Sequence, residues 1–493
     1  MGPVTAAPGL PAGFGVALDP RLRRVDRGRV LIGGTPMRLV RLSDAGCRAL
    51  DRLVGGATVP GPGATATLAR HLVAAGMAHP RPPLPPQAGV ADVAVVIPVR
   101  DRPEGLGRAL AGIGPVAELV VVDDGSTDAR AAAAVTAAAG ATLLRTPRPG
   151  GPAAARNRGL HATTAPLVAF VDSDCEPAPG WLDGLLPHLD DPVVGLVAPR
   201  VTAPPPAPGD GPLARYESVR SPLDMGPGEA AVRAGGLVPY VPSAVLLVRR
   251  EAALAVGGFD EALRVGEDVD FVWRLAAAGW TARYEPAVRV THAPRRRLGD
   301  WLGQRAAYGG SAAALSRRHP GRLAAARLSP GAALGWALLM LRRPAPALGL
   351  AAVATLRLGR RLRPLGGPWR EAARLSAAGH ATTARVLADQ ATRTWWPAAL
   401  GAALVSRRAR RALVLVAVLP SLAEWWERRP ELDPVRYCAL RIADAAAYGA
   451  GVWAGCARER TAGPLLPRLE RREAGSATAG LWKTVVHMLG KVD

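Results

Sequence analysis

The stretch Leu167–Trp181, LVAFVDSDCEPAPGW, sets narrow limits on the fold of this chain. Its first five residues, Leu167–Val171, form an uninterrupted apolar run, which is typical of a strand buried on both faces of a parallel sheet. The run ends at Asp172 and Asp174, and two prolines and a glycine then interrupt regular structure. Carboxylates at the end of such a strand lie where open α/β sheets bind ligands. Taken alone, however, the two aspartates could equally turn the chain or cap the next helix, so the neighbouring segments decide.

Those segments alternate between strand and helix patterns. A turn with Asp123-Asp124-Gly125 follows one apolar run, and a helix carrying Arg156 precedes another. This alternation predicts an α/β fold with a doubly wound, mostly parallel sheet. The predicted strands cover Val93–Val99, Leu119–Val122, Ala141–Arg145, Leu167–Val171, Val193–Val197, Val241–Val248, Ala282–Tyr284 and Val288–Thr291.

The composition narrows the class of protein. A chain of 493 residues divides into several units, and we expect boundaries that give a module over 14–86, a core over 91–325 and a tail over 326–493. The net charge of +22 comes almost wholly from arginine in an Ala, Gly and Pro-rich chain and gathers towards the tail, so we predict no nucleic-acid partner. Four scattered cysteines form no C-x-x-C pair, and no secretory signal is evident. A reducing, cytosolic setting follows.

Residues 14–86 read as a small separate module. Two β-like runs flank Asp26-Arg27-Gly28, and helical runs follow over Ala45–Val54 and Thr65–Ala75. The pattern resembles a winged-helix module, and more loosely the peptide-binding domain of systems that modify ribosomal peptides. Only Arg70 and His71 would be available on the second helix to read DNA bases. The proline-rich stretch Pro80–Pro86 predicts a stiff linker.

The pattern of apolar runs in the tail predicts helices with arginines at their ends. The uninterrupted apolar runs are shorter than the roughly 20 residues that span a bilayer. Tryptophan pairs bracket two of them, as at a membrane interface, which predicts a helical region at the cytoplasmic face of a bacterial cell membrane. A soluble alanine-rich helical bundle is the alternative. The runs are Gly331–Leu341, Ala345–Leu356, Pro397–Val405, Ala412–Leu422 and Tyr437–Ala457.

The acidic residues of the core fit the needs of a nucleotide-sugar transferase. Asp124, with Asp123 behind it, ends an early strand where a base and ribose would bind. Oxygen ligands suit Mg²⁺ or Mn²⁺ on a diphosphate, and Asp172 and Asp174 supply them. A general base must lie on the opposite face of the sugar, and Asp268, at a helix start, is the best candidate.

Five segments together resemble glycosyltransferase family 2, the inverting enzymes of the GT-A fold. Their order and approximate spacing match the family over about residues 91–310. The segments are VAVVIPVRDRP (Val93–Pro103), VVVDDGSTD (Val120–Asp128), GGPAAARNRGL (Gly150–Leu160), VAFVDSD (Val168–Asp174) and GGFDEALRVGEDVDF (Gly257–Phe271).

The resemblance implies a role for each predicted site residue. Asp268 would be the catalytic base, with Glu267 and Asp270 beside it as acceptor or auxiliary groups. The metal, Mg²⁺ or Mn²⁺, would be held by Asp172 and Asp174, with His292 as a third ligand. The nucleotide-sugar-binding set would be Pro98, Arg100, Asp101, Asp123, Asp124, Arg156 and Ser173.

The whole chain is similar to members that glucosylate a peptide-derived redox cofactor of the mycofactocin type. We therefore predict inverting transfer of a hexose, such as glucose from UDP-glucose, to a hydroxyl of a peptide-derived small molecule at the membrane surface. Arg100-Asp101 replaces the family's frequent Tyr-Asn, and no Q-x-x-R-W signature of processive synthases is present. A metal-dependent nucleotidyltransferase and a non-catalytic basic membrane or DNA-binding scaffold stay open as alternatives.

Overall fold

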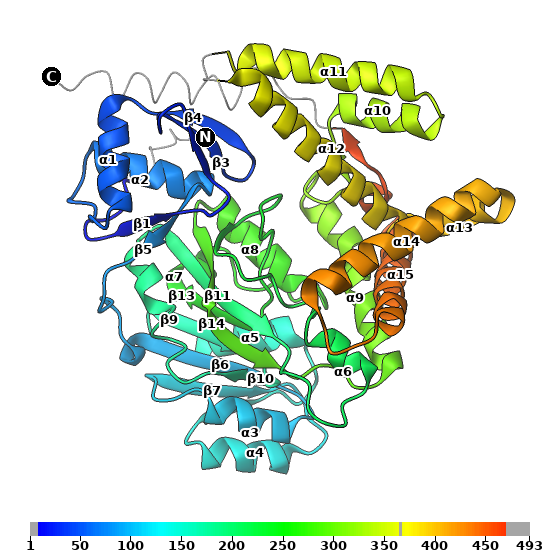
Figure 1. Ribbon diagram of the computed structural model, residues 1–493. Coiled ribbons are helices and arrows are strands. Elements are labelled where there is room, and N and C mark those ends of the chain that lie inside the picture. Colours follow the sequence, from blue (N-terminus) through cyan, green and yellow to red (C-terminus); the bar gives the residue numbers. More distant parts are fainter. Residues whose placement is uncertain (1–7, 364–366, 470–493) are drawn as a thin grey trace. The chain divides into compact units, whose positions relative to one another are not determined.

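A computed structural model describes residues 8–363 and 367–469, which form two compact units (Figure 1). The first unit runs as far as Arg295, apart from two short segments near the N-terminus. The second unit begins at Arg296 and includes those segments, Arg24–Leu31 and Val40–Ser43. The division falls earlier than the expected boundary near residue 325.

The N-terminal residues form the two predicted helices. Each of the two predicted β-like runs is divided into two short strands, and a fifth strand, Ala78–Arg81, overlaps the start of the stretch predicted as a linker. The turn between β2 and β3 has positive φ at Asp26, Arg27 and Gly28, as a tight hairpin requires. Two sheets result, one pairing β1 with β5 and one of order β2-β3-β4. The elements are β1 (Gly15–Leu18), β2 (Arg23–Val25), β3 (Val30–Gly33), β4 (Arg38–Arg41), α1 (Asp44–Val54), α2 (Ala64–Ala75) and β5 (Ala78–Arg81).

Buried and exposed ion pairs join this N-terminal part to the larger sheet domain of the same unit. Arg70 of α2 donates to both carboxylate oxygens of Asp191, at 2.6 and 2.8 Å, and both residues are buried. Arg81 of β5 forms a more exposed pair with Glu229. Apart from Arg24–Leu31 and Val40–Ser43, the two parts therefore share one compact unit.

A nine-stranded mixed sheet forms the centre of the first unit, in the order β10-β14-β11-β13-β9-β6-β7-β8, with β12 paired to β14. The strands β8, β7, β6 and β9 are parallel as predicted, but β13 runs antiparallel to both β9 and β11. The sheet is thus mixed rather than mostly parallel. The strands are β6 (Val93–Val99), β7 (Glu118–Asp123), β8 (Thr142–Arg145), β9 (Leu167–Val171), β10 (Cys175–Pro177), β11 (Val194–Thr202), β12 (Ala230–Val232), β13 (Val245–Arg249) and β14 (Thr281–His292).

Helices cover this sheet and help to bury its central strands. All five residues of β9 are buried, and all but Pro98 of β6 are buried too. The carboxylate of Asp128 caps α4 by accepting from the amides of Arg130 and Ala131. The helices are α3 (Pro103–Ala111), α4 (Ala129–Ala138), α5 (Pro152–Ala162), α6 (Pro212–Glu217), α7 (Arg250–Ala255) and α8 (Glu267–Ala277).

The second unit is built from helices. Every apolar run predicted in the tail forms a helix, apart from Leu341, which directly follows α10, whereas α12 was not predicted. Within the described residues, no helix combines the length and apolarity needed to cross a membrane. The helices are α9 (Leu298–Arg318), α10 (Pro330–Met340), α11 (Pro344–Arg361), α12 (Pro368–Thr392), α13 (Trp396–Val405), α14 (Arg407–Arg428) and α15 (Pro434–Arg458), with a small pair of strands, β15 (Arg327–Leu328) and β16 (Arg468–Leu469).

Helices α9 and α15 pack closely because glycines line their contact. A Cβ atom added at Gly309 would collide with the carbonyl oxygen of Tyr448, and one at Gly451 would collide with that of Ala306. The same contact buries Arg305, which pairs with Asp444 at 3.0 Å. The helix α9, which the sequence grouped with the core, therefore belongs with the helical unit.

Candidate active site

The strand β9 delivers two aspartates to the edge of the sheet. The amide of Asp172 still donates to Ala244 O at 2.8 Å, so the strand pairing continues to the first carboxylate. The next strand, β10, pairs antiparallel with β14 and sets Cys175 opposite His292. This register brings His292 Nε2 within 3.5 Å of Asp174 Oδ1.

A buried arginine links the first of these aspartates to the start of α8. Arg156 of α5 donates to Asp172 Oδ1 at 2.6 Å and to Glu267 Oε1 at 2.9 Å. Its guanidinium also lies over the ring of Phe259, 5.4 Å from the ring centroid. Burial by itself lowers the pKa of Arg156, but the charges of Asp172 and Glu267 outweigh burial and raise it above the usual value. Arg156 is therefore a fixed cation between two carboxylates.

Asp174 lies among cationic groups. It forms an ion pair with Arg102 and lies beside His292. Burial opposes ionisation of Asp174, yet the hydrogen bond and charge of His292, with the charges of Arg102 and Arg295, lower its pKa to about 2. The carboxylate is therefore ionised at neutral pH.

Asp268 has the opposite electrostatic setting. Its Oδ1 accepts from the amide of Val269 at 2.8 Å and its Oδ2 from that of Ser243 at 3.2 Å. Burial and then the charge of Glu267 raise its pKa to about 7, although Arg156 and the two amides act in the other direction. A carboxylate with this pKa can accept a proton near neutral pH.

Most residues predicted to bind the nucleotide lie at the ends of β6 and β7, whereas Ser173 follows β9 and Arg156 lies in α5. Asp124 accepts hydrogen bonds from the amides of Gly150 and Gly151, both at 2.8 Å. Asp101 has a positive φ of 55° and accepts from the amide of Thr127 at 2.6 Å, which joins the loops after the two strands. Arg100 is exposed, whereas Asp123, Pro98 and Ser173 are buried or half-buried.

Two residues outside the predicted set contact it, Arg102 and Ser243, and a third, Asn157, holds a neighbouring loop. Arg102 pairs with Asp174, and the quoted segment VIPVRDRP contains it. Asn157, from the predicted helix, holds the loop before α8 by exchanging hydrogen bonds with the backbone of Phe259, both at 2.8 Å. Ser243 acts through its backbone amide, which no side-chain pattern announces. Asp270 is buried and bonds to Arg274 at 2.6 Å, so it does not lie on the helix surface.

The chemistry of the donor set suits a hard divalent cation. Asp174 and His292 lie together, and Mg²⁺ commonly takes only one or two carboxylates from the protein, with substrate phosphates completing the shell. No three acidic, histidine or cysteine side chains of the described residues are grouped as a metal cluster. Asp172 faces Arg156 instead, so ligation by all three predicted residues stays a prediction.

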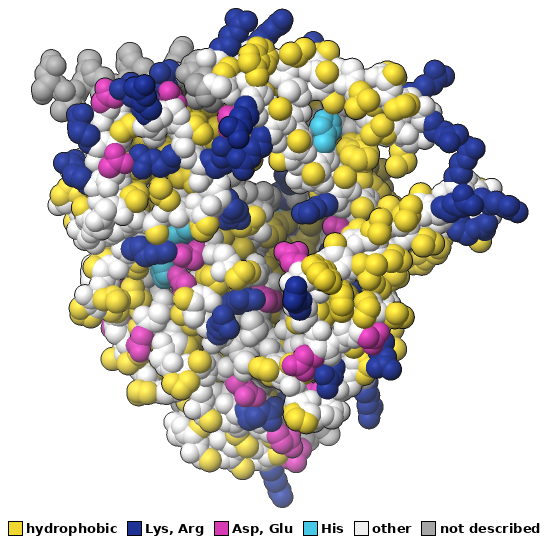
Figure 2. Space-filling model, viewed as in Figure 1, with side chains coloured by type: hydrophobic (Ala, Val, Ile, Leu, Met, Phe, Trp, Pro, Cys, Tyr) yellow, Lys and Arg dark blue, Asp and Glu magenta, His cyan; other side chains and the backbone are white. Residues whose placement is uncertain are grey.

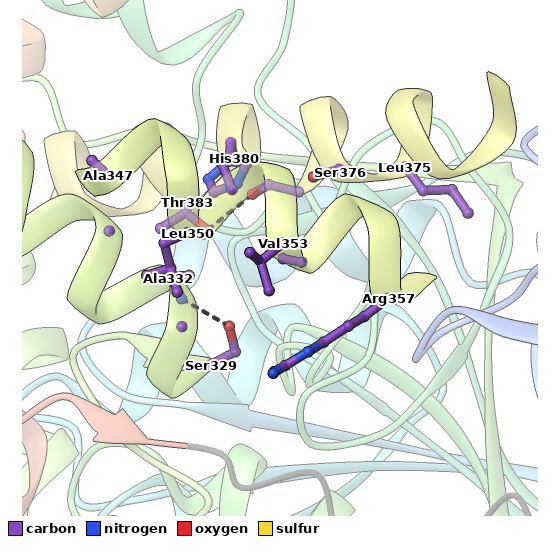
Figure 3. A pocket seen from close by; sticks show the side chains of 15 residues that line it. Ser329, Ala332, Ala347, Leu350, Val353, Arg357, Leu375, Ser376, His380 and Thr383 are labelled. Carbon is purple, nitrogen blue, oxygen red and sulfur yellow. Dashed lines mark hydrogen bonds between the residues drawn. The ribbon is translucent and has the colours of Figure 1, made fainter. Parts of the chain in front are cut away.

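A separate cavity of about 310 Å³ lies in the helical unit, between α10, α11 and α12 (Figure 3). Small and apolar side chains line most of it, and Arg357 and His380 supply its basic groups. Ser329 caps α10 at its border by accepting from the amide of Ala332 at 3.2 Å. None of the predicted transferase residues lines this cavity.

Comparison with known proteins identifies the family to which the chain belongs. The sequence profile described as glycosyl transferase family 2 matches residues 94–253. The pre-mycofactocin glycosyltransferase of Mycobacterium tuberculosis is 42% identical over 471 residues, which cover 93% of this chain and 98% of that protein. The succinoglycan biosynthesis protein ExoU of Rhizobium meliloti is 30% identical over 207 residues, 40% of this chain and 60% of that one.

Solved structures give weaker likenesses. The mannosyltransferase PcManGT from Pyrobaculum calidifontis, in complex with GDP-Man and Mn²⁺, covers 62% of this chain and 90% of its own, with 21% identity and a TM-score of 0.35. The family match and the mixed sheet confirm the predicted GT-A type of α/β fold. With a relative this similar over almost its full length, the chain belongs to glycosyl transferase family 2.

Proposed function

We propose that this enzyme transfers a hexose, with inversion, from a nucleotide sugar to a hydroxyl of a peptide-derived acceptor. The observation that carries the proposal is the arrangement around Arg156, which holds Asp172 and Glu267 together while Asp268 next to them has a pKa of about 7. The side with Asp172 suits the binding of a diphosphate through a metal ion. The side with Asp268 suits the acceptance of a proton from the acceptor. Membership of the family favours this reaction over the nucleotidyltransferase and scaffold alternatives.

The residues divide the work between donor and acceptor. Asp124 and Asp101, at the ends of β7 and β6, would position the base and ribose. Asp268 would take the proton from the acceptor hydroxyl as that oxygen attacks the anomeric carbon and the diphosphate leaves. A divalent cation, held by Asp174 and Asp172 with His292, would neutralise charge on the diphosphate.

We also propose the chemical identity of the acceptor and of the donor. The name of the relative from M. tuberculosis, pre-mycofactocin glycosyltransferase, supports a precursor of that type as the acceptor. We propose UDP-glucose as the donor. We also propose that the N-terminal part, of winged-helix type, binds the peptide-derived acceptor, and that the helical unit brings the enzyme to the cytoplasmic face of the membrane.

A donor screen tests the reaction. Purified full-length enzyme is incubated with UDP-glucose, UDP-galactose or GDP-mannose and the acceptor, with Mn²⁺ or with a chelator, and released nucleoside diphosphate is measured. We expect UDP to be released from UDP-glucose only when acceptor and metal are present. NMR of the new linkage should show a β-anomer, and an α-anomer would contradict inversion. Release of inorganic pyrophosphate from a nucleoside triphosphate and a sugar phosphate would instead favour the nucleotidyltransferase.

A further inference from the structure

Two helix turns of the second unit expose apolar side chains directly beside arginines. At the end of α10, Met340 is 77% exposed and Leu341 71%, and Arg342-Arg343 follow. At the end of α13, Leu404 is 83% exposed and Val405 88%, and α14 opens with Arg407. Single exposed apolar residues are ordinary, but repeated pairs at helix ends are a feature of interaction sites. We call Leu339–Arg343 and Leu404–Arg411 together the arginine edge.

The arginines of this edge are not neutralised within the described residues. Arg342, Arg343 and Arg407 form no ion pair there, and the three further arginines of the edge form none either. The surrounding sequence contains no acidic residue from 331 to 370 or from 390 to 423. All six side chains are exposed, so their charge faces outward; the further three are Arg408, Arg410 and Arg411.

Both turns project to the same side of the helical unit in Figure 1. Figure 2 shows basic side chains at that side and hydrophobic ones along the helices behind them. On α14 the exposed apolar residues Val414, Leu415 and Leu419 continue the surface from the basic turn. The exposed arginines and the exposed apolar side chains therefore lie next to each other in the helical unit.

This combination fits the surface of a bilayer that contains anionic phospholipid. Acidic headgroups attract exposed arginines, and apolar side chains at helix ends enter the boundary with the acyl chains. A second copy of the chain fits less well, because six positive charges would face six others. We infer that the arginine edge inserts into an anionic leaflet as a shallow contact that does not span the membrane. The inference deepens the proposed location and leaves the transfer reaction independent of it.

Vesicle flotation tests this with the full-length protein. The vesicles contain phosphatidylcholine alone, or equal parts of phosphatidylcholine and phosphatidylglycerol. An arginine next to an anionic leaflet contributes about fivefold in affinity, so R407Q/R408Q/R410Q/R411Q should weaken binding to the anionic vesicles by at least about tenfold. L404E/V405E should weaken it similarly, because the apolar contact becomes a charged one. Both variants should release UDP from UDP-glucose in solution as the unaltered enzyme does.

Matched control variants test whether vesicle binding depends on the arginine edge or on exposed arginines and exposed apolar residues in general. R27Q/R41Q/R48Q/R52Q removes four exposed arginines near the N-terminus, and L84E/V435E replaces two apolar residues that are each 77% exposed. Neither should change vesicle binding by more than about twofold, since none of these residues belongs to the arginine edge.

Several results would overturn the inference. These are equal binding to neutral and anionic vesicles, unchanged binding by both edge variants, equal losses in the matched controls, or no binding by the unaltered protein. Analytical ultracentrifugation adds another: a dimer that dissociates in the edge variants would identify a second copy as the occupant. Loss of UDP release with intact vesicle binding would count against the proposed reaction alone.

Discussion

At the scale of single residues, Asp268 has a role that a neutral isostere can test. Asp268→Asn keeps the shape of the side chain but removes its ability to accept the acceptor proton. We expect turnover to fall about 10²- to 10⁴-fold, the usual contribution of a general base, with little change in donor affinity. Steady-state kinetics with UDP-glucose and isothermal titration of UDP measure the two effects. A variant with full turnover would remove Asp268 from the mechanism.

The raised pKa of Asp268 gives a pH dependence with a defined sign. The base that we propose works when ionised, so kcat/KM should rise with pH and level off above the pKa of Asp268, about 7. Because this pKa is higher in the folded state than the ordinary value of 3.8, folding favours the protonated form, and stability falls as pH rises between the two values. Asp268→Asn should therefore melt at a higher temperature than the unaltered enzyme at pH 8 and at nearly the same temperature at pH 4. Equal differences at both pH values would contradict this assignment.

Arg156 should matter for stability as well as for rate. Replacing it by methionine leaves Asp172 and Glu267 facing each other without a cation, which costs about 3–5 kcal/mol for a buried pair. Arg156→Lys keeps the charge but cannot reach both carboxylates with one planar group, so we expect an intermediate loss. Chemical denaturation measures both, and Arg108→Met, which disrupts an exposed pair with Glu176, serves as control with a loss below about 1 kcal/mol. Comparable losses in Arg156→Met and Arg108→Met would contradict a buried bridge.

At the scale of helices and strands, the glycines between α9 and α15 allow a direct test of packing. Gly309→Ala places a methyl group against the backbone of Tyr448 and should destabilise the helical unit by about 1–3 kcal/mol. Gly303, on the same helix, has open space at its Cβ position, so Gly303→Ala should stabilise the unit by about 0.5–1 kcal/mol. Thermal melting followed by circular dichroism compares them. The same change in both variants would argue against close contact.

The sequence predicted the positions of strands and helices better than it predicted which strands pair and in which direction. The runs that became β6, β7 and β9 are apolar apart from Glu118 and Asp123 at the ends of β7, so burial could be read from most of their residues directly. The reversed strand β13 was predicted as a strand, but its direction depends on the path of the connecting loops. That path also produces the antiparallel pairing of β10 with β14. Helix α12 was missed because its apolar residues are interrupted by polar ones along its length.

The same limit holds for the site: the sequence indicates single residues but not the contacts between them. Asp172, Asp174 and Asp268 were predicted as site residues from their type and position, since each follows a strand or starts a helix. The bridge from Arg156 to Glu267 joins residues 111 positions apart, and no local spacing reveals it. Arg102 lies in a quoted motif, but its pairing with Asp174 depends on the position of α3 beside β10.

At the scale of the whole first unit, the pair Arg70–Asp191 should contribute strongly to stability. Arg70→Met leaves a buried carboxylate without its cation, so we expect a loss of about 3–5 kcal/mol in urea unfolding. Arg81→Met removes the more exposed link to Glu229 and should cost less than about 1 kcal/mol. A single shared unfolding transition should persist in the control. Similar small losses in both variants would mean that the N-terminal part is only loosely attached.

The buried pair also bears on how such chains diversify. Arg70 and Asp191 are 121 positions apart, yet each is costly to keep without the other. Relatives should therefore keep both residues or replace both together. A chimera that takes its first 86 residues from a relative lacking this arginine should fold poorly unless position 191 is exchanged as well. The N-terminal part is thus not an interchangeable cassette, and exchanging it for another requires the matching residue on the sheet domain.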